Sequence, residues 1–349
     1  MRQMAIMKRL IFTSCSLLLV FGLGIQRTVA ATWYLNENES GTVGVQVGDD
    51  STTTGPYWFE YYGQAGFDAT HTYANSSSRP NSGGKYIRIA VPANTHDGGM
   101  QLRNPSGLYG GNAFSEGSPV TLSRGATVYW GGFFRFHRVA GGGTTPIWDL
   151  SNGFDKFFEI NSASSSSNAI RWIILTGWPG IYNGTWNDKF TFSMAFSPTY
   201  CGSYPGTCGP SPNGWNFYER TQNFNGHNDA NPYLCDYDRW YSVIAKVVVD
   251  DTFGTHGGSA SLYINGTEVW RETGIRTMRS GYTSATLGRL IMDTTWDQPD
   301  YSTAQHERQY DGLIATDDLT YLQNNGYFSD PEAGGDTTPP AAPSGLGVQ

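Results

Sequence analysis

Residues 239–250 read RWYSVIAKVVVD, and this stretch decides the fold class. Successive side chains of a β-strand point to opposite faces, so a half-buried strand alternates apolar and polar residues. The alternate positions that would share one apolar face are Tyr241, Val243, Ala245, Val247 and Val249. The stretch therefore predicts a strand with one face in a core.

Comparable runs recur along the chain between turn residues. They cover residues 85–91, 127–139, 156–161, 170–176, 189–197, 216–221, 259–271, 287–293 and 309–322. In 127–139, Val128, Trp130, Phe134 and Phe136 fall on one face and Tyr129, Arg135 and His137 on the other. Residues 259–271 contain Asn265-Gly266, a two-residue hairpin signal. No amphipathic helix of good length is present, so we predict an all-β jelly-roll sandwich of two antiparallel sheets.

The two ends differ from the middle of the chain. Arg2, Lys8 and Arg9 precede an apolar run at 10–23, and small residues follow at 28–31, which is typical of a secretory signal peptide. We expect a signal peptide at 1–30, a jelly-roll domain at 31–331 and a Pro/Thr-rich linker at 332–349. The linker's end resembles the first residues of a fibronectin type III domain. The protein is predicted to be secreted, monomeric and free of membrane spans.

Charge limits the partners. The chain has 22 basic and 30 acidic residues; the four basic residues before residue 31 leave 18 against 30, a net charge of −12. Such a surface repels nucleic acid, and it repels a polyanionic glycan unless a local basic patch intervenes. Aromatic residues make up 14% of the chain, which suits stacking on sugar rings as well as filling a sandwich core. We expect an extracellular polysaccharide as the partner.

Three cysteines follow the predicted signal peptide, so one is left unpaired. Cys201 and Cys208 close a small Gly/Pro loop and are the first choice for a disulfide. A bond between Cys201 and Cys235 is the alternative. An oxidising compartment permits either.

Three segments together resemble the concanavalin-A-like polysaccharide lyases, in particular glucuronan lyases and fungal cellulose-induced secreted proteins. They are TVYWGGFFRF at 127–136 with DKFFEI at 155–160, WYSVIAKVVV at 240–249 with LYING at 262–266, and YDGLIATDDL at 310–319. The resemblance spans roughly residues 84–321 and implies a concanavalin-A-like jelly roll. It also implies a structural calcium near the chain ends, with Asp317 and Asp318 as ligands and Glu39 or Glu60 as their acidic partner. The alternative is that one Asp of the pair caps a loop and the other faces solvent.

A lyase of this kind must neutralise a sugar carboxylate, remove the adjacent C5 proton and protonate the leaving oxygen. Arg, Gln or Asn can do the first, and Tyr or His the other two. The candidates are Gln101, Arg103, Arg135, His137, His306 and Tyr310. Strict alternation along 156–160 puts Phe157 and Glu159 on the cleft face, where a carboxylate disfavours an anionic substrate.

Two other functions stay open. A glycoside hydrolase needs two facing carboxylates, for which Glu159 and Glu219 are the candidates, with sugar platforms at Trp172, Trp178, Trp215 and Phe217. A non-catalytic glycan-binding module needs only aromatic side chains and a few amides, and Trp172, Trp178, Trp186, Trp215 and Trp296 could serve. We rank polysaccharide lyase first, glycan binding second and hydrolase third.

Overall fold

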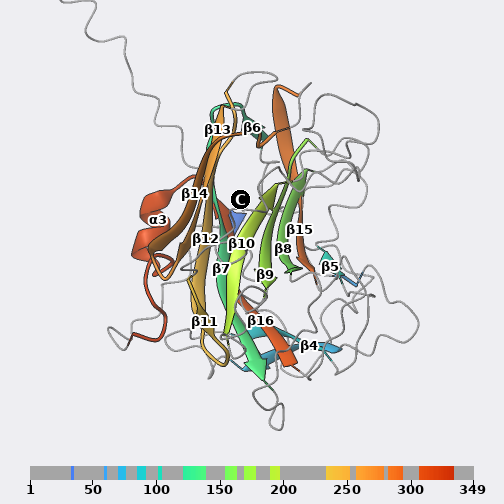
Figure 1. Ribbon diagram of the computed structural model, residues 1–349. Coiled ribbons are helices and arrows are strands. Elements are labelled where there is room, and N and C mark those ends of the chain that lie inside the picture. Colours follow the sequence, from blue (N-terminus) through green and yellow to red (C-terminus); the bar gives the residue numbers. More distant parts are fainter. Residues whose placement is uncertain are drawn as a thin grey trace, which may run out of the picture. The chain divides into compact units, whose positions relative to one another are not determined.

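The alternating stretch at 239–250 forms β12 (Tyr241–Val248), whose predicted apolar face is fully buried. The structure is a computed structural model and consists mostly of β-strands, with β12 in the middle (Figure 1). The structure describes residues 33–34, 59–60, 70–75, 85–91, 101–103, 121–138, 154–162, 169–177, 189–196, 233–251, 257–278, 282–293 and 306–333. All of them belong to one compact unit, residues 32–349. The predicted strand at 216–221, the signal peptide and most of the linker lie outside the described residues.

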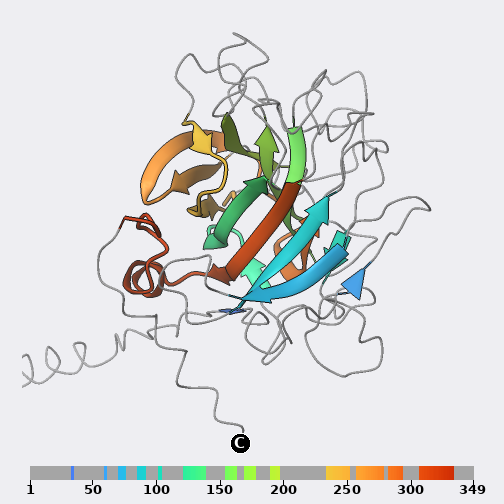
Figure 2. The ribbon, with the colours of Figure 1, turned by 90° about the horizontal axis from the view of Figure 1, so that it is seen from below.

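Strands from distant parts of the sequence form a first sheet, called sheet A. Its order is β14 (Thr267–Ile275), β13 (Gly258–Ile264), β12, β7 (Thr127–Arg138), β16 (His306–Thr316), β4 (Lys85–Val91) and β3 (Thr70–Asn75), and β1 (Trp33–Tyr34) also pairs with β16. Figure 2 shows β16, in red, between β7 and β4. Asn265 and Gly266 join β13 to β14 with φ angles of 49° and 78°, as the predicted hairpin turn requires.

The remaining strands form sheet B. Its order is β11 (Cys235–Asp236), β10 (Lys189–Phe196), β9 (Arg171–Gly177), β8 (Phe154–Ser162), β15 (Ser284–Asp293), β5 (Gln101–Arg103) and β2 (Phe59–Glu60), with β6 (Thr121–Ser123) also paired to β15. Every pairing in both sheets is antiparallel. The chain crosses repeatedly between the sheets, so the predicted all-β sandwich of jelly-roll type is confirmed.

The core lies between the inner faces of the two sheets. Phe134 of β7 packs edge-on against Phe157 of β8 at 5.1 Å between ring centroids, and Phe136 packs against Phe190 of β10 at 4.9 Å. All four rings are fully buried. Burial of each contributes about 1.5–3 kcal/mol, so these pairs hold the sheets face to face.

The outer face of sheet A, turned away from sheet B, is covered by the end of the domain. The predicted strand at 309–322 is wrong in its second half, because β16 ends at Thr316 and α3 (Leu319–Asn324) follows. Figure 1 shows α3 on this side of the sheet. Leu322 of α3 and Tyr327 after it join a second apolar cluster with Tyr86, Tyr129, Phe133, Trp240, Ile244 and Ile314. The part of this face under α3 is therefore apolar and covered.

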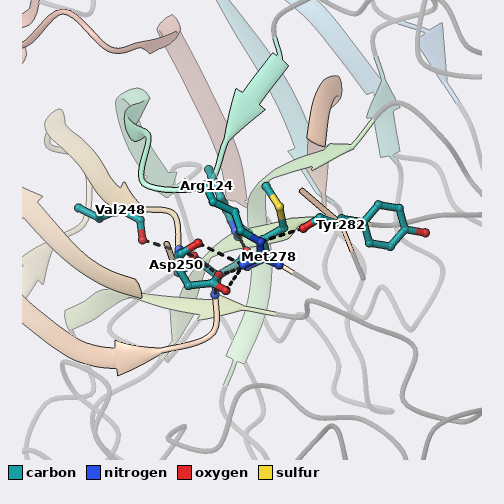
Figure 3. Close-up of polar contacts among 7 residues, drawn as sticks. Arg124, Val248, Asp250, Met278 and Tyr282 are labelled. Carbon is teal, nitrogen blue, oxygen red and sulfur yellow. Dashed lines mark hydrogen bonds and ion pairs between the residues drawn. The ribbon is translucent and has the colours of Figure 1, made fainter. Parts of the chain in front are cut away.

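A buried carboxylate ties the ends of several strands together (Figure 3). Asp250, after β12, accepts hydrogen bonds at Oδ1 from the amides of Thr277 (3.0 Å) and Met278 (2.8 Å). Its Oδ2 forms an ion pair with Arg124, whose Nε donates to the carbonyl of Tyr282 at 2.8 Å. Asp250 thus satisfies backbone groups that would otherwise be buried without a partner.

Candidate functional site

The outer face of sheet B carries the polar side chains that the sequence singled out around residue 159. Residues directly opposite each other in antiparallel strands share a face. Glu159 of β8 lies opposite Ile291 of β15, and Ile291 lies opposite Arg103 of β5. Gln101 lies opposite Asp293 on the same face. The structure thus brings the positions of Gln101, Arg103 and Glu159 together, as three of the predicted site residues.

This face is basic in an acidic protein. By register, its charged positions are Arg103, Lys156, Glu159, Arg171, Lys189, Asp236, Arg289 and Asp293. Five basic and three acidic residues give +2, against −8 for the whole chain. By register, basic positions therefore outnumber acidic ones on this face.

Glu159 is the centre of a buried polar unit on this face. Its side chain is 2% exposed and accepts two parallel hydrogen bonds from Arg171, from Nε at 2.9 Å and from Nη2 at 2.7 Å. The amide nitrogen of Asn161 also donates to Glu159. A bidentate pair of this kind fixes the guanidinium plane and neutralises the carboxylate. Arg171, at 20% exposure, is the member of the pair that reaches the surface.

A β-bulge overturns the predicted alternation along β8. Lys156 lies opposite Leu175 and Phe158 opposite Ile174, so Phe157 is an extra residue in the ladder. Phe157 and Phe158 are both fully buried in the core. Phe157 therefore leaves the cleft face, and Lys156 takes a register position on the same face as Glu159.

Three predicted site residues are core residues instead. Tyr310 is fully buried, stacks on Phe157 at 4.7 Å and donates its hydroxyl hydrogen to the carbonyl of Phe157 at 3.1 Å. His306 is on the same inner face of sheet A and is fully buried beside Phe136. Trp172 is fully buried, with its indole Nε1 donating to the carbonyl of Thr277 at 2.8 Å. None of them faces the outer side of sheet B, so the sugar-stacking role of Trp172 is corrected to a core role.

Arg135 and His137 lie on the outer face of sheet A, as the alternation predicted, and so on the opposite side of the sandwich from Glu159. Arg135 lies over the buried ring of Trp240, 5.6 Å from its centroid. Nδ1 of His137 is 2.7 Å from Oδ1 of Asp238. These side chains do not join the polar unit on sheet B.

The remaining predicted site residues lie outside the described residues. They are the aromatic sugar contacts Trp178, Trp186, Trp215, Phe217 and Trp296 and the hydrolase carboxylate Glu219.

Only part of the expected calcium site lies among the described side chains, so the site stays a prediction. Asp318 is the N-cap of α3, and its Oδ1 accepts the amide of Tyr321 at 2.9 Å, while Asp317 is exposed. Glu60 is in sheet B, whereas the Asp pair follows sheet A, and Glu39 lies outside the described residues. Within the described ranges, no group of three or more His, Cys, Asp or Glu side chains could hold a metal. The capping alternative accounts for the Asp pair.

Cys235 is a free, buried thiol, and burial raises its pKa well above the ordinary value. Cys235 thus forms no disulfide in this structure. Cys201 and Cys208 lie outside the described residues, so their pairing stays a prediction. No described helix is long and apolar enough to cross a membrane.

Sequence reasoning missed Arg171, Asn161 and Lys156. Arg171 and Asn161 are directly opposite each other on neighbouring strands, a relation that only the register reveals. The tandem aromatic pair Phe157-Phe158 was the available signal for the bulge, because two consecutive bulky residues cannot both enter a core from a regular strand.

The comparisons with known proteins gave matches only among solved structures. No family model and no curated protein matches the chain. The alginate lyase Aly36B is 12% identical with a TM-score of 0.44, covering 82% of this chain and 97% of that one. An endo-β-1,4-glucuronan lyase from Trichoderma reesei is 9% identical with a TM-score of 0.40, covering 83% and 99%.

The globular domain of T. cruzi calreticulin is also matched, at 7% identity and a TM-score of 0.37, covering 80% of this chain and 90% of that one. Alginate and glucuronan lyases are the kind of enzyme that the sequence motifs resemble. One fold hosts many functions, and proteins matched at this level can differ in activity.

Proposed function

We propose that this protein is secreted, binds a uronic-acid-containing polysaccharide on the outer face of sheet B and cleaves it by β-elimination. The observation that carries the proposal is the polar unit of Asn161, Arg171 and a neutralised Glu159, with Gln101 and Arg103 at register positions on the same face. Every uronic acid unit carries a carboxylate, and guanidinium groups are suited to pair with it.

The ion pair removes the main objection to an anionic substrate. A lone carboxylate on the face would repel the polymer, but Glu159 is paired through both oxygens with Arg171. The same pairing disfavours a hydrolase, because a general acid or base needs a carboxylate oxygen within reach of the substrate. Glu159 is therefore assigned to positioning rather than to proton transfer.

β-Elimination also needs a group that withdraws the C5 proton. A sugar carboxylate held by Arg171 or Arg103 becomes less repulsive to the negative charge that develops at C5. The described strands place Lys156 and Asp293 at register positions on this face, and either residue is a candidate for the base. These strands place no His or Tyr at the register positions of this face. A lysine serves as a base when its surroundings lower its pKa. As the base takes the C5 proton, the C4–C5 double bond forms and the C4–O bond breaks, and the leaving oxygen takes a proton from the protonated base or from water.

Glycan binding without cleavage is the second candidate. It is favoured by one specific observation: His306 and Tyr310, the predicted proton-transfer residues, are buried between the sheets. A module of this kind would keep the basic face and its salt-dependent affinity for the polymer.

The test is an elimination assay on the mature protein with glucuronan, alginate, polygalacturonate and glycosaminoglycans. The signal is the ultraviolet absorbance of the new C4–C5 double bond. We expect activity on at least one polymer and a loss of about 100-fold in Arg171→Ala, the scale for removing one charge-stabilising donor. Arg271→Ala, which removes an exposed arginine on the edge strand β14, is the matched control.

Two outcomes separate the candidates. Polymer binding that weakens with salt, without any absorbance change, would replace the lyase by the binding module. Absence of both binding and cleavage on every acidic polymer would refute the proposal.

A further inference from the structure

Two buried polar side chains on the outer face of sheet B are left without a hydrogen-bond partner. Oδ1 of Asn161, on β8, and Oγ of Ser193, on β10, find no partner among the residues that the structure describes. The two residues are 7% and 1% exposed. Leaving a buried polar group unsatisfied costs stability, so each such group calls for an explanation.

The orientation of the Asn161 amide follows from its neighbour. Its nitrogen donates to the carboxylate of Glu159, which can only accept. The opposite atom, Oδ1, is therefore an acceptor. Glu159 holds Asn161 and Arg171 at the same time, so an acceptor and a cation lie side by side in a fixed arrangement.

This pair of groups matches the chemistry of a uronic acid unit. Such a sugar presents a carboxylate, which needs a cationic donor, and hydroxyl groups, which need acceptors. Arg171 offers the first and Asn161 the second. Ser193 is a further hydroxyl partner on the same face.

We infer that Asn161 Oδ1 and Ser193 Oγ are glycan-contact atoms that bond sugar hydroxyls, and that Glu159 is a positioning residue for Asn161 and Arg171. This inference rests on the proposed function, because it places the polymer on the same face. It goes further by naming two contacts and by separating carboxylate recognition from hydroxyl recognition.

The register also sets the length of the ligand. Asn161 lies opposite Arg171, and Ser193 lies opposite Leu175, four residues further along β9. The two contacts are thus two strands and four residues apart, about 10 Å across and about 13 Å along the sheet, or roughly 16 Å in all. One pyranose ring cannot span this distance, so both contacts require an oligosaccharide.

Thr176 provides a matched control for Ser193. Its Oγ1 is likewise buried and has no partner within the described part of the chain. However, Thr176 lies opposite the core residue Phe192, on the inner face of sheet B. Ser193→Ala and Thr176→Val each delete one unpartnered buried hydroxyl, but only the first is on the proposed glycan face.

The experiment measures binding and thermal unfolding of the full mature protein and its variants, with glucuronan, alginate and polygalacturonate oligosaccharides as probes. Ser193→Ala is expected to lower affinity for the bound probe about threefold to tenfold, as for one neutral hydrogen bond, without lowering Tm. Asn161→Leu is expected to lower affinity at least as much, and it should also lower Tm, because it removes a donor to the buried Glu159. Thr176→Val should leave affinity unchanged.

With disaccharide probes, only one of the two substitutions should lower the affinity, because a disaccharide cannot span both contacts. Affinities of Ser193→Ala and Asn161→Leu equal to that of the unaltered protein would overturn the inference while leaving the proposed function intact. Equal losses in Thr176→Val would overturn it as well, since the effect would then be general. If the unaltered protein binds none of the probes, the proposed function fails and these contacts fail with it.

Discussion

Replacing Asp250 by alanine tests whether the buried polar cluster around Asp250 in Figure 3 holds the strand ends together. The side chain is 1% exposed, and it accepts the amides of Thr277 and Met278 besides pairing with Arg124. Asp250→Ala leaves these donors buried without an acceptor. Removing one partner of a buried pair costs about 3–5 kcal/mol.

The expected shift in Tm follows from the size of the domain. Unfolding entropy is about 2.1 cal/mol/K per residue near 60 °C, or about 0.6 kcal/mol/K for roughly 300 residues. A loss of 3–5 kcal/mol therefore lowers Tm by about 5–8 °C. Thermal unfolding and urea titration, both followed by circular dichroism, measure the change.

Asp236→Ala is the matched control, because it breaks an ion pair with Lys189 in which Asp236 is 51% exposed. An exposed pair contributes about 0.2–1 kcal/mol, so Tm should move by less than about 2 °C. A double-mutant cycle of Arg124→Leu and Asp250→Asn should give a coupling energy of about 1–3 kcal/mol. If Asp250→Ala is no more destabilising than Asp236→Ala, the polar contacts of Asp250 do not stabilise the strand ends and this prediction is refuted.

Three further outcomes are expected. Leu322→Ala, at a fully buried position of α3, should lower the free energy of unfolding in urea by about 2–5 kcal/mol. Leu319→Ala, on the exposed side of the same helix, should change it very little. Equal losses in the two variants would contradict the covering role of α3. Cys235 should resist alkylation in the native protein at pH 8, since burial raises the pKa of its thiol, and peptide mapping can check this. Above about pH 8.5 only the unfolded thiol ionises, so the free energy of unfolding should fall there. Unfolding at several pH values measures this fall, which Cys235→Ala should abolish. Tyr310→Phe should lower stability by about 0.5–1.5 kcal/mol through the lost bond to Phe157 and leave glycan binding unchanged; a specific loss of binding would return Tyr310 to the site.

Local pattern was sufficient wherever a strand is regular. The alternation in 239–250 predicted which face of β12 is buried, and that in 127–139 separated the core side of β7 from Arg135 and His137. The turn at Asn265-Gly266 was predictable too, since its backbone requires positive φ at both residues. These features depend on residues close together in the chain.

The candidate site depended on relations between distant strands. Gln101 and Glu159 were both predicted, yet nothing in the sequence says that β5 and β8 flank β15 and so put them on one face. His306 and Tyr310 have polar groups suited to catalysis, but the pairing of β16 with β7 points them into the core. Burial is a property of the packed sandwich, and residue type alone does not decide it.

Alternation along single strands was enough to predict the fold class and the faces of the regular strands, and composition was enough for the acidic character of the protein. The position of the basic face, the neutralisation of Glu159 by Arg171 and the bulge at Phe157 that moves Lys156 to this face depend on the tertiary structure. The physical reason is that alternation is local to one strand, whereas the order of the strands, their register and a single inserted residue determine which side chains meet across a sheet.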